Sequence, residues 1–142
     1  MTQSGRAFLD SGDPLYGPAQ AIPPEPGSYT VVMHGNSDST YVGADPISAD
    51  DLGTMLENDP NYHGEPVRLF SCETGQGTDP YAQELADRLG VDVSAPDQLA
   101  WADINGNTFV TSANGTDIYG RPVPNVPYDG KWQPFQPRKG ED

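Results

Sequence analysis

Short apolar runs, separated by stretches with helical spacing, dominate the middle of the chain. Three runs are rich in Val and other apolar or β-branched side chains, which is typical of buried strands. They are residues 29–33, 67–70 and 91–94. Further along, Asn105-Gly106 lies between the apolar stretches 101–102 and 108–110, a pattern that predicts a β-hairpin.

Two amphipathic helices are predicted between these strands. Ser48 can cap the first helix, with Asp51 three residues later as in a variant of the capping box. In the second helix, Asp79 is the predicted cap, Pro80 takes the first position and Gly90 ends the helix. The apolar stripes are Leu52, Met55 and Leu56 in the first helix, and Ala82, Leu85, Ala86 and Leu89 in the second.

The order strand, helix, strand, helix, strand predicts an α/β fold, a small parallel-core sheet flanked by helices with a C-terminal β-hairpin. Residues 29–137 are expected to form a single domain. The density of Pro and Gly in residues 1–28 predicts a lead-in outside the core, either a linker from a larger parent protein or a strap lying on the domain. Trp132 and Phe135 predict that the C-terminal segment docks on the domain, with a loose tail at 138–142.

The charge balance narrows the classes of partner. Lys and Arg number 7 and Asp and Glu number 21, which gives a net charge of −14 in 142 residues. Such a chain lacks the basic surface that nucleic acids or anionic membranes require. The acidic surface has two readings, a solvated face that favours solubility or a face for a basic inhibitor or immunity protein. A single cysteine excludes an internal disulfide and favours a reducing cytosol, and we expect a monomer.

Two reactive side chains follow neighbouring strands directly. His34-Gly35 comes after the first predicted strand, and Ser71-Cys72 comes after the second. Because the carboxyl ends of parallel strands meet at one edge of a sheet, His34 and Cys72 are expected on the same rim. A thiol beside an imidazole is the pair that nucleophilic catalysis needs. The alternative is that Cys72 is a small packed hydrophobe.

The other histidine points to no metal or cofactor site. His63 lies in a loop before the second strand, hence at the opposite edge of the sheet, where a surface or turn role is expected. Structural zinc sites usually carry closely spaced pairs of Cys or His ligands, and the chain has none. Phosphate-binding and dinucleotide-binding glycine motifs are also missing. We therefore expect neither a metal nor a cofactor.

The stretches 31–35 (Val-Val-Met-His-Gly) and 67–75 (Val-Arg-Leu-Phe-Ser-Cys-Glu-Thr-Gly) resemble the caspase-like clan of cysteine peptidases. Within that clan, they are most similar to the small self-processing protease domains of large bacterial toxins. Residues 91–96 and 130–137 also look like C-terminal segments of secreted bacterial polymorphic toxins. The resemblance spans 29–137 and implies a three-layer α/β sandwich.

The resemblance also implies roles for three residues. His34 would be the acid/base, Cys72 the nucleophile, and the backbone amides of Gly35 and Cys72 the oxyanion hole. The amides of the loop 73–78 are further candidate donors, and a side chain at position 35 is expected to crowd the substrate. A parent protein secreted from bacteria, with the domain acting in the reducing cytosol of a recipient cell, is the implied setting.

Two family features are missing from this chain. The Gln-Ala-Cys-x-Gly run of caspases does not occur, so specificity for aspartate is not carried over. Toxin self-processing domains bind inositol hexakisphosphate in a strongly basic pocket, and seven basic residues spread over the chain do not build one.

Three functions remain open from the sequence. The first is a cysteine endopeptidase-like hydrolase, acting as a toxin or effector domain on a protein substrate or cutting its own parent chain. The second is a deamidase or transglutaminase-type acyl transfer through the same Cys–His pair, and the third is a non-catalytic acidic binding domain of the same fold. No third orienting acid is assigned, although Asp38 and Asp45 are available. Candidate substrate-binding residues are Asp38, Asp45, Ser71, Glu73, Pro96, Asp97 and Trp101.

Overall fold

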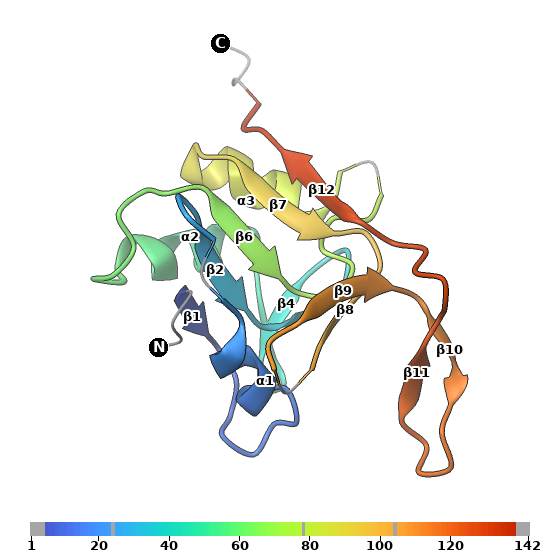
Figure 1. Cartoon of the computed structure of the whole chain (residues 1–142). Coiled ribbons are helices and arrows are strands. Elements are labelled where there is room, and N and C mark those ends of the chain that lie inside the picture. The colour runs from blue at the N-terminus through green and yellow to red at the C-terminus, as the bar shows by residue number, and fades with distance from the viewer. Residues whose placement is uncertain (1–4, 24, 78, 104, 139–142) are drawn as a thin grey trace.

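A five-stranded sheet forms the centre of the molecule in the computed structural model (Figure 1). The structure describes residues 5–23, 25–77, 79–103 and 105–138. In sheet order the strands are β1 (Gly5–Ala7), β2 (Tyr29–Val32), β6 (Val67–Phe70), β7 (Val93–Pro96) and β12 (Trp132–Phe135). The first four strands are parallel and β12 is antiparallel to β7. The chain is therefore a mixed α/β protein with a parallel core, as the sequence predicts.

Two helices cover one face of this sheet. They are α2 (Ala49–Glu57) and α3 (Tyr81–Leu89). Their apolar stripes pack against β2, β6 and β7, and Leu52, Leu69 and Leu85 are fully buried there. Because odd-numbered residues of β6 face this core, Arg68 and Phe70 face the other side of the sheet.

The helix ends test the predicted caps. The Ser48 hydroxyl accepts a hydrogen bond from the Asp51 N–H at 3.0 Å, so the predicted cap of α2 is confirmed. Gly90 ends α3 in the left-handed conformation, with φ 71°, also as predicted. The predicted cap at Asp79 is wrong, because Pro80 occupies the cap position and no side chain caps α3. Asp79 instead forms an ion pair with Arg138 at 3.1 Å.

Residues 1–28, expected to lie outside the core, contribute a strand and a helix to it. Strand β1 pairs with β2, and α1 (Tyr16–Ala21) packs on the face opposite α2 and α3. Ala19 and Ile22 are fully buried against Val32 and Phe70. The Pro and Gly content of this segment therefore does not exclude a short strand and a short helix, and Gly17 and Pro18 lie within α1 itself.

Small antiparallel sheets surround the central sheet. They comprise β3 (His34–Gly35), β4 (Thr40–Val42) and β5 (Asp45–Ile47), then β8 (Leu99–Ala102) with β9 (Thr108–Thr111), and β10 (Ala113–Thr116) with β11 (Pro122–Pro124). The β8–β9 pair confirms the hairpin predicted from Asn105-Gly106. Figure 1 shows the β10–β11 hairpin projecting from the body of the molecule. No helix of the described residues is long and apolar enough to cross a membrane.

The C-terminal segment docks on the sheet, as its aromatic residues predict. The Trp132 ring lies 6.1 Å from the Phe70 ring, centroid to centroid, and Phe135 packs against the core under α3. The guanidinium of Arg138, expected to begin a loose tail, instead binds the Asp87 carboxylate at 2.6 Å. Residues 139–142 lie outside the described part of the chain.

The Asp129 carboxylate links the C-terminal segment to the end of β9. Its protonation in acid should therefore lower the stability of the fold. Asp129 accepts hydrogen bonds from the Ser112 hydroxyl, the Ser112 N–H and the Thr111 hydroxyl, at 2.6, 2.7 and 2.9 Å, which lower its pKa to about 2. Because the unfolded pKa is about 4, this contribution is complete above pH ~4 and is lost as pH falls towards 2. Asp129→Asn should therefore lower the Tm at pH 6 and flatten its fall below pH 4, measured by thermal denaturation. The exposed Asp92→Asn is the matched control, and an equal effect there would contradict the assignment.

Candidate active site

His34 is fixed by a carboxylate from the N-terminal segment. The residue lies two positions beyond the end of β2, where it begins β3. Its Nε2 is 2.6 Å from Oδ2 of Asp13, and the other carboxylate oxygen accepts the Leu15 N–H at 2.8 Å. The imidazole side chain remains 52% exposed, so it is oriented by Asp13 and still open to a ligand.

The state of Asp13 sets the tautomer of the imidazole. Partial burial raises the pKa of Asp13, but the bond from the Leu15 N–H, the bond from His34 and the charge of His34 together bring it below its ordinary value. A carboxylate only accepts hydrogen bonds, so Nε2 of His34 must be the donor. In the neutral ring, Nδ1 then carries the lone pair, and none of the described residues bonds it. The neutral ring thus presents a proton acceptor at Nδ1.

The Cys72 thiol lies at the end of the neighbouring strand, next to β8. Its sulfur accepts a hydrogen bond from the Ala100 N–H at 3.4 Å and lies 3.8 Å from the Ala100 carbonyl oxygen. Burial raises the pKa of the thiol, the charge of Glu73 raises it further, and the Ala100 N–H offsets only part of this. The resting group is therefore a neutral thiol, and none of its described hydrogen bonds reaches His34.

A cavity of about 510 Å³ brings the two groups together. Its polar lining consists of Asp13, His34 and Cys72. The remaining lining residues are Pro14, Leu15, Pro18, Leu99, Ala100, Trp101, Ala102 and Pro122. This combination of an apolar wall and a few convergent polar groups is typical of small-molecule and peptide sites. The indole of Trp101 is held in place by a hydrogen bond to the Thr111 carbonyl at 2.9 Å.

The backbone after Cys72 is strained, and its amides are occupied. Glu73 has φ 60° and is the one non-glycine residue with positive φ among those described, a conformation that costs on the order of 1–3 kcal/mol. The N–H groups of residues 73–76 donate to protein carbonyls. These four amides are therefore not oxyanion donors, contrary to the prediction for this part of the loop 73–78, of which Thr78 lies outside the described residues.

Gly35 is required for packing. A Cβ at this position would overlap the Ser71 hydroxyl oxygen and crowd the Thr74 side chain. Ser71 is buried behind the rim, and its hydroxyl has no hydrogen-bond partner. The glycine thus lets β3 lie close to the Cys72 loop, and the expected crowding of substrate stays a prediction. Ser71 does not line the cavity.

The other predicted substrate-binding residues lie outside the cavity. Asp38 and Asp45 are exposed on the β3–β5 sheet, and Pro96 is buried in β7. Asp97 accepts hydrogen bonds from the C-terminal segment, at 2.8 Å from the Lys131 N–H. Glu73 is next to Cys72 but does not line the cavity. Of the predicted substrate-binding residues, Trp101 does line it.

Sequence reasoning missed Asp13 and the wall that α1 provides. Asp13 lies 21 residues before His34, in a segment expected outside the core, and no local spacing links the two. A signal was present in Asp13-Pro14, a pattern that favours a turn, but it says nothing of an imidazole partner. Among the described residues, no group of three or more His, Cys, Asp or Glu could hold a metal ion.

The effect of the Glu73 charge on the pKa of the Cys72 thiol can be measured directly. Glu73→Gln removes a negative charge that raises the Cys72 pKa while leaving burial unchanged, so the pKa should fall. Alkylation by iodoacetamide at pH 7 should then be faster than in the unchanged chain. Glu84→Gln, on the exposed face of α3, makes the same change in net charge and should leave the rate unaltered. Equal rates in all three proteins would contradict the assignment.

Comparison with known families covers the part of the chain that carries this cavity. One family model, described as a domain of unknown function (DUF8616), matches residues 5–110, from β1 through most of β9. No curated protein matches the chain. Asp13, His34 and Cys72 lie within the matched residues, whereas β10, β11 and β12 follow them. The match spans most of the chain, which therefore belongs to the DUF8616 family.

Proposed function

We propose that this protein is a cysteine hydrolase that cleaves a peptide bond, with Cys72 as nucleophile, His34 as acid/base and Asp13 as the residue that orients the imidazole. The observation that carries the proposal is the shared cavity. A thiol and an imidazole line it together, and the imidazole is held by a carboxylate. This is the arrangement of nucleophile, base and orienting group that covalent catalysis uses.

The neutral thiol dictates the first step. Because burial keeps Cys72 protonated, His34 acts as a general base on the thiol rather than resting beside a thiolate. Nδ1 takes the thiol proton while the sulfur attacks the substrate carbonyl carbon, and the carbonyl oxygen becomes an oxyanion. His34 then gives the proton to the departing amine as the C–N bond breaks. Water hydrolyses the thioester, releases a carboxylate and restores the thiol.

The Cys72 thiol and the His34 imidazole form a hydrogen bond with each other only when substrate binds. In the free protein, the thiol is bonded to Ala100 and the imidazole to Asp13, and catalytic hydrogen bonds often form only in the complex. The amides of Gly35 and Cys72 are the proposed oxyanion donors. The amide of Cys72 is next to the sulfur, where the attacked carbonyl would lie.

The finer fold and biological setting are part of the same proposal. The parallel core with helices on both faces is compatible with a caspase-like three-layer sandwich. A toxin or effector domain of a larger secreted protein would work in a reducing cytosol, where its single thiol stays free. The net charge of −14 would suit a basic inhibitor or immunity protein.

A peptide library decides between the candidate reactions. The full chain and Cys72→Ser are each incubated with peptides derived from a proteome, and products are identified by mass spectrometry. Peptidase activity predicts new peptide ends that depend on Cys72. Gln side chains converted to Glu without cleavage would instead favour deamidase or transglutaminase-type chemistry. Equal products with Cys72→Ser would contradict both reactions.

One observation favours a non-catalytic acidic binding domain as the second candidate. The thiol has a raised pKa and is bonded to Ala100, as a packed cysteine would be. In that case, Cys72→Ala should leave every measurable property except stability unchanged, and a basic partner should bind with an affinity that falls steeply with salt.

A further inference from the structure

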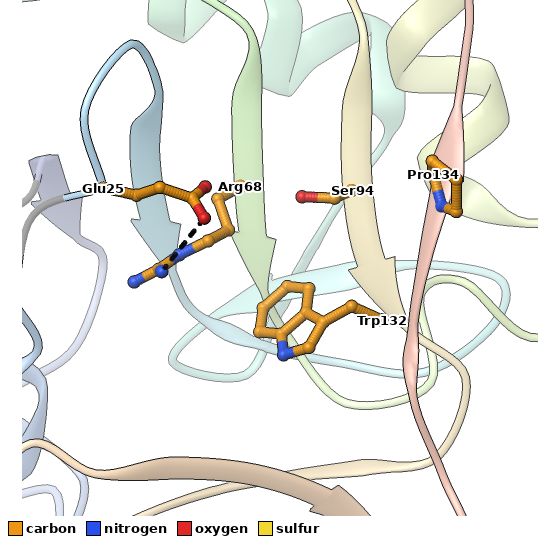
Figure 2. Close-up of a pocket in the computed structure, with 5 residues that line it drawn as sticks. All are labelled: Glu25, Arg68, Ser94, Trp132 and Pro134. Atoms are coloured by element: carbon orange, nitrogen blue, oxygen red, sulfur yellow. Dashed lines mark ion pairs between the residues drawn. The ribbon is translucent and has the colours of Figure 1, made fainter.

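A second cavity, of about 350 Å³, opens on the sheet face that carries α1. It is lined by Glu25, Arg68, Ser94, Trp132 and Pro134 (Figure 2). None of these residues lines the cavity that contains Cys72. This cavity is therefore separate from the proposed hydrolase site.

Arg68 projects into this cavity with few partners for a charged group. Its side chain is only 17% exposed, and its buried Nε has no hydrogen-bond partner in the described part of the chain. One terminal nitrogen lies 3.9 Å from a Glu25 carboxylate oxygen, and the other donates to the Pro23 carbonyl at 3.4 Å. Both contacts are longer than a charge-assisted hydrogen bond, which is about 2.7–2.9 Å. A guanidinium has five N–H donors, so most of its capacity is unused.

The neighbouring strands add polar groups in the same row. Thr30 is the cross-strand partner of Arg68 on β2, and Ser94 is its partner on β7. The Thr30 hydroxyl does not line the cavity; it is fully buried and has no hydrogen-bond partner among the described residues. Figure 2 shows the Ser94 hydroxyl pointing toward Arg68. Unpaired buried polar groups cost free energy, so the unpaired Nε of Arg68 indicates a group beside the guanidinium that the described residues do not supply.

We propose that this cavity binds a carboxylate carried by an amino acid or short peptide. The planar guanidinium matches a carboxylate, which can accept two parallel N–H donors from it. The Trp132 ring, 5.9 Å from the guanidinium carbon, and Pro134 offer an apolar wall to the rest of the ligand. The Glu25 carboxylate is half-exposed and lies 3.9 Å from a terminal nitrogen of Arg68. It is therefore a weak partner of the guanidinium, which the carboxylate of the ligand would displace.

Tryptophan fluorescence gives a direct test. Trp101→Phe leaves Trp132 as the one tryptophan of the full chain and keeps an aromatic ring beside Phe109. N-acetylalanine offers an α-carboxylate, N-acetylaspartate α-methylamide offers a side-chain carboxylate, and N-acetylalanine methylamide offers neither. Inorganic phosphate is the fourth probe. Saturable quenching by either carboxylate supports the proposal, and the tighter one identifies the source of the carboxylate.

Two variants must shift the affinity in opposite directions. Arg68→Met should weaken carboxylate binding by at least about tenfold, because charge-assisted hydrogen bonds are lost. Glu25→Gln should tighten binding, because the competing carboxylate is gone. Glu84→Gln makes the same charge change on the opposite sheet face and should leave the affinity unchanged.

Several results would overturn the proposal. They are binding of phosphate alone, equal binding of the neutral methylamide, or an unchanged affinity in Arg68→Met. If Arg68→Met does not fold, Arg68→Lys keeps the charge but removes the planar pair of donors, and should still bind more weakly. A loss of affinity in Glu25→Gln would also contradict the assigned competition.

Discussion

Replacing His34 by Gln is expected to slow the acylation of Cys72 by p-nitrophenyl acetate about 10²- to 10⁴-fold at neutral pH, the usual contribution of a general base. The thiol is neutral because burial raises its pKa, so attack needs an acceptor for its proton. His34 lines the same cavity and has Nδ1 free. The release of nitrophenol in the first turnover measures the rate, and this ester needs no knowledge of the natural substrate.

Two controls make this result specific. His63→Gln removes the other histidine, which is exposed in a loop and does not line the cavity, and should keep the full rate. Cys72→Ser gives the background from other surface nucleophiles. The proposed base is refuted if His34→Gln and His63→Gln acylate at the same rate.

Leu85→Ala is expected to lower the free energy of unfolding by about 2–5 kcal/mol, the range for deleting a fully buried leucine side chain. Leu85 is completely buried where α3 packs on the central sheet. The same helix holds both loops of the candidate site, since the Tyr81 N–H donates to the Ser37 carbonyl and the Ala82 N–H to the Thr74 carbonyl. Urea denaturation followed by circular dichroism measures the change.

Leu89→Ala is the matched control on α3. Its side chain is only partly buried, so less apolar surface is lost and the destabilisation should be clearly smaller. Equal losses from Leu85→Ala and Leu89→Ala would contradict the assigned core.

Periodicity predicted the central elements because it reports local burial. Strand β6 begins and ends where its apolar run does, and the stripe of α3 is the one that packs on the sheet. The cap at Ser48 was predictable because its bond to Asp51 spans three residues. At Asp79 the same reasoning failed, because a more distant partner, Arg138, binds that carboxylate.

The parts of the site that were missed depend on contacts distant in sequence. His34 and Cys72 could be predicted on one rim because each follows a parallel strand. Asp13 could not, because its role depends on how the N-terminal segment folds over the sheet. The environment of Cys72 was equally hidden, since its partner Ala100 lies on a hairpin 28 residues away. Burial by that hairpin turns an expected reactive thiolate into a neutral thiol.

The most direct test of the catalytic assignment is the rate of Cys72 acylation by p-nitrophenyl acetate as a function of pH, in the unchanged chain, His34→Gln and Asp13→Asn. We expect a rise in the neutral range, where imidazoles act as bases, that is absent in His34→Gln and reduced in Asp13→Asn. His34→Gln should keep an alkaline rise alone, from direct ionisation of a thiol whose pKa is raised by burial. If the unchanged chain shows the alkaline rise alone, Cys72 is a packed thiol and the proposed active site is wrong.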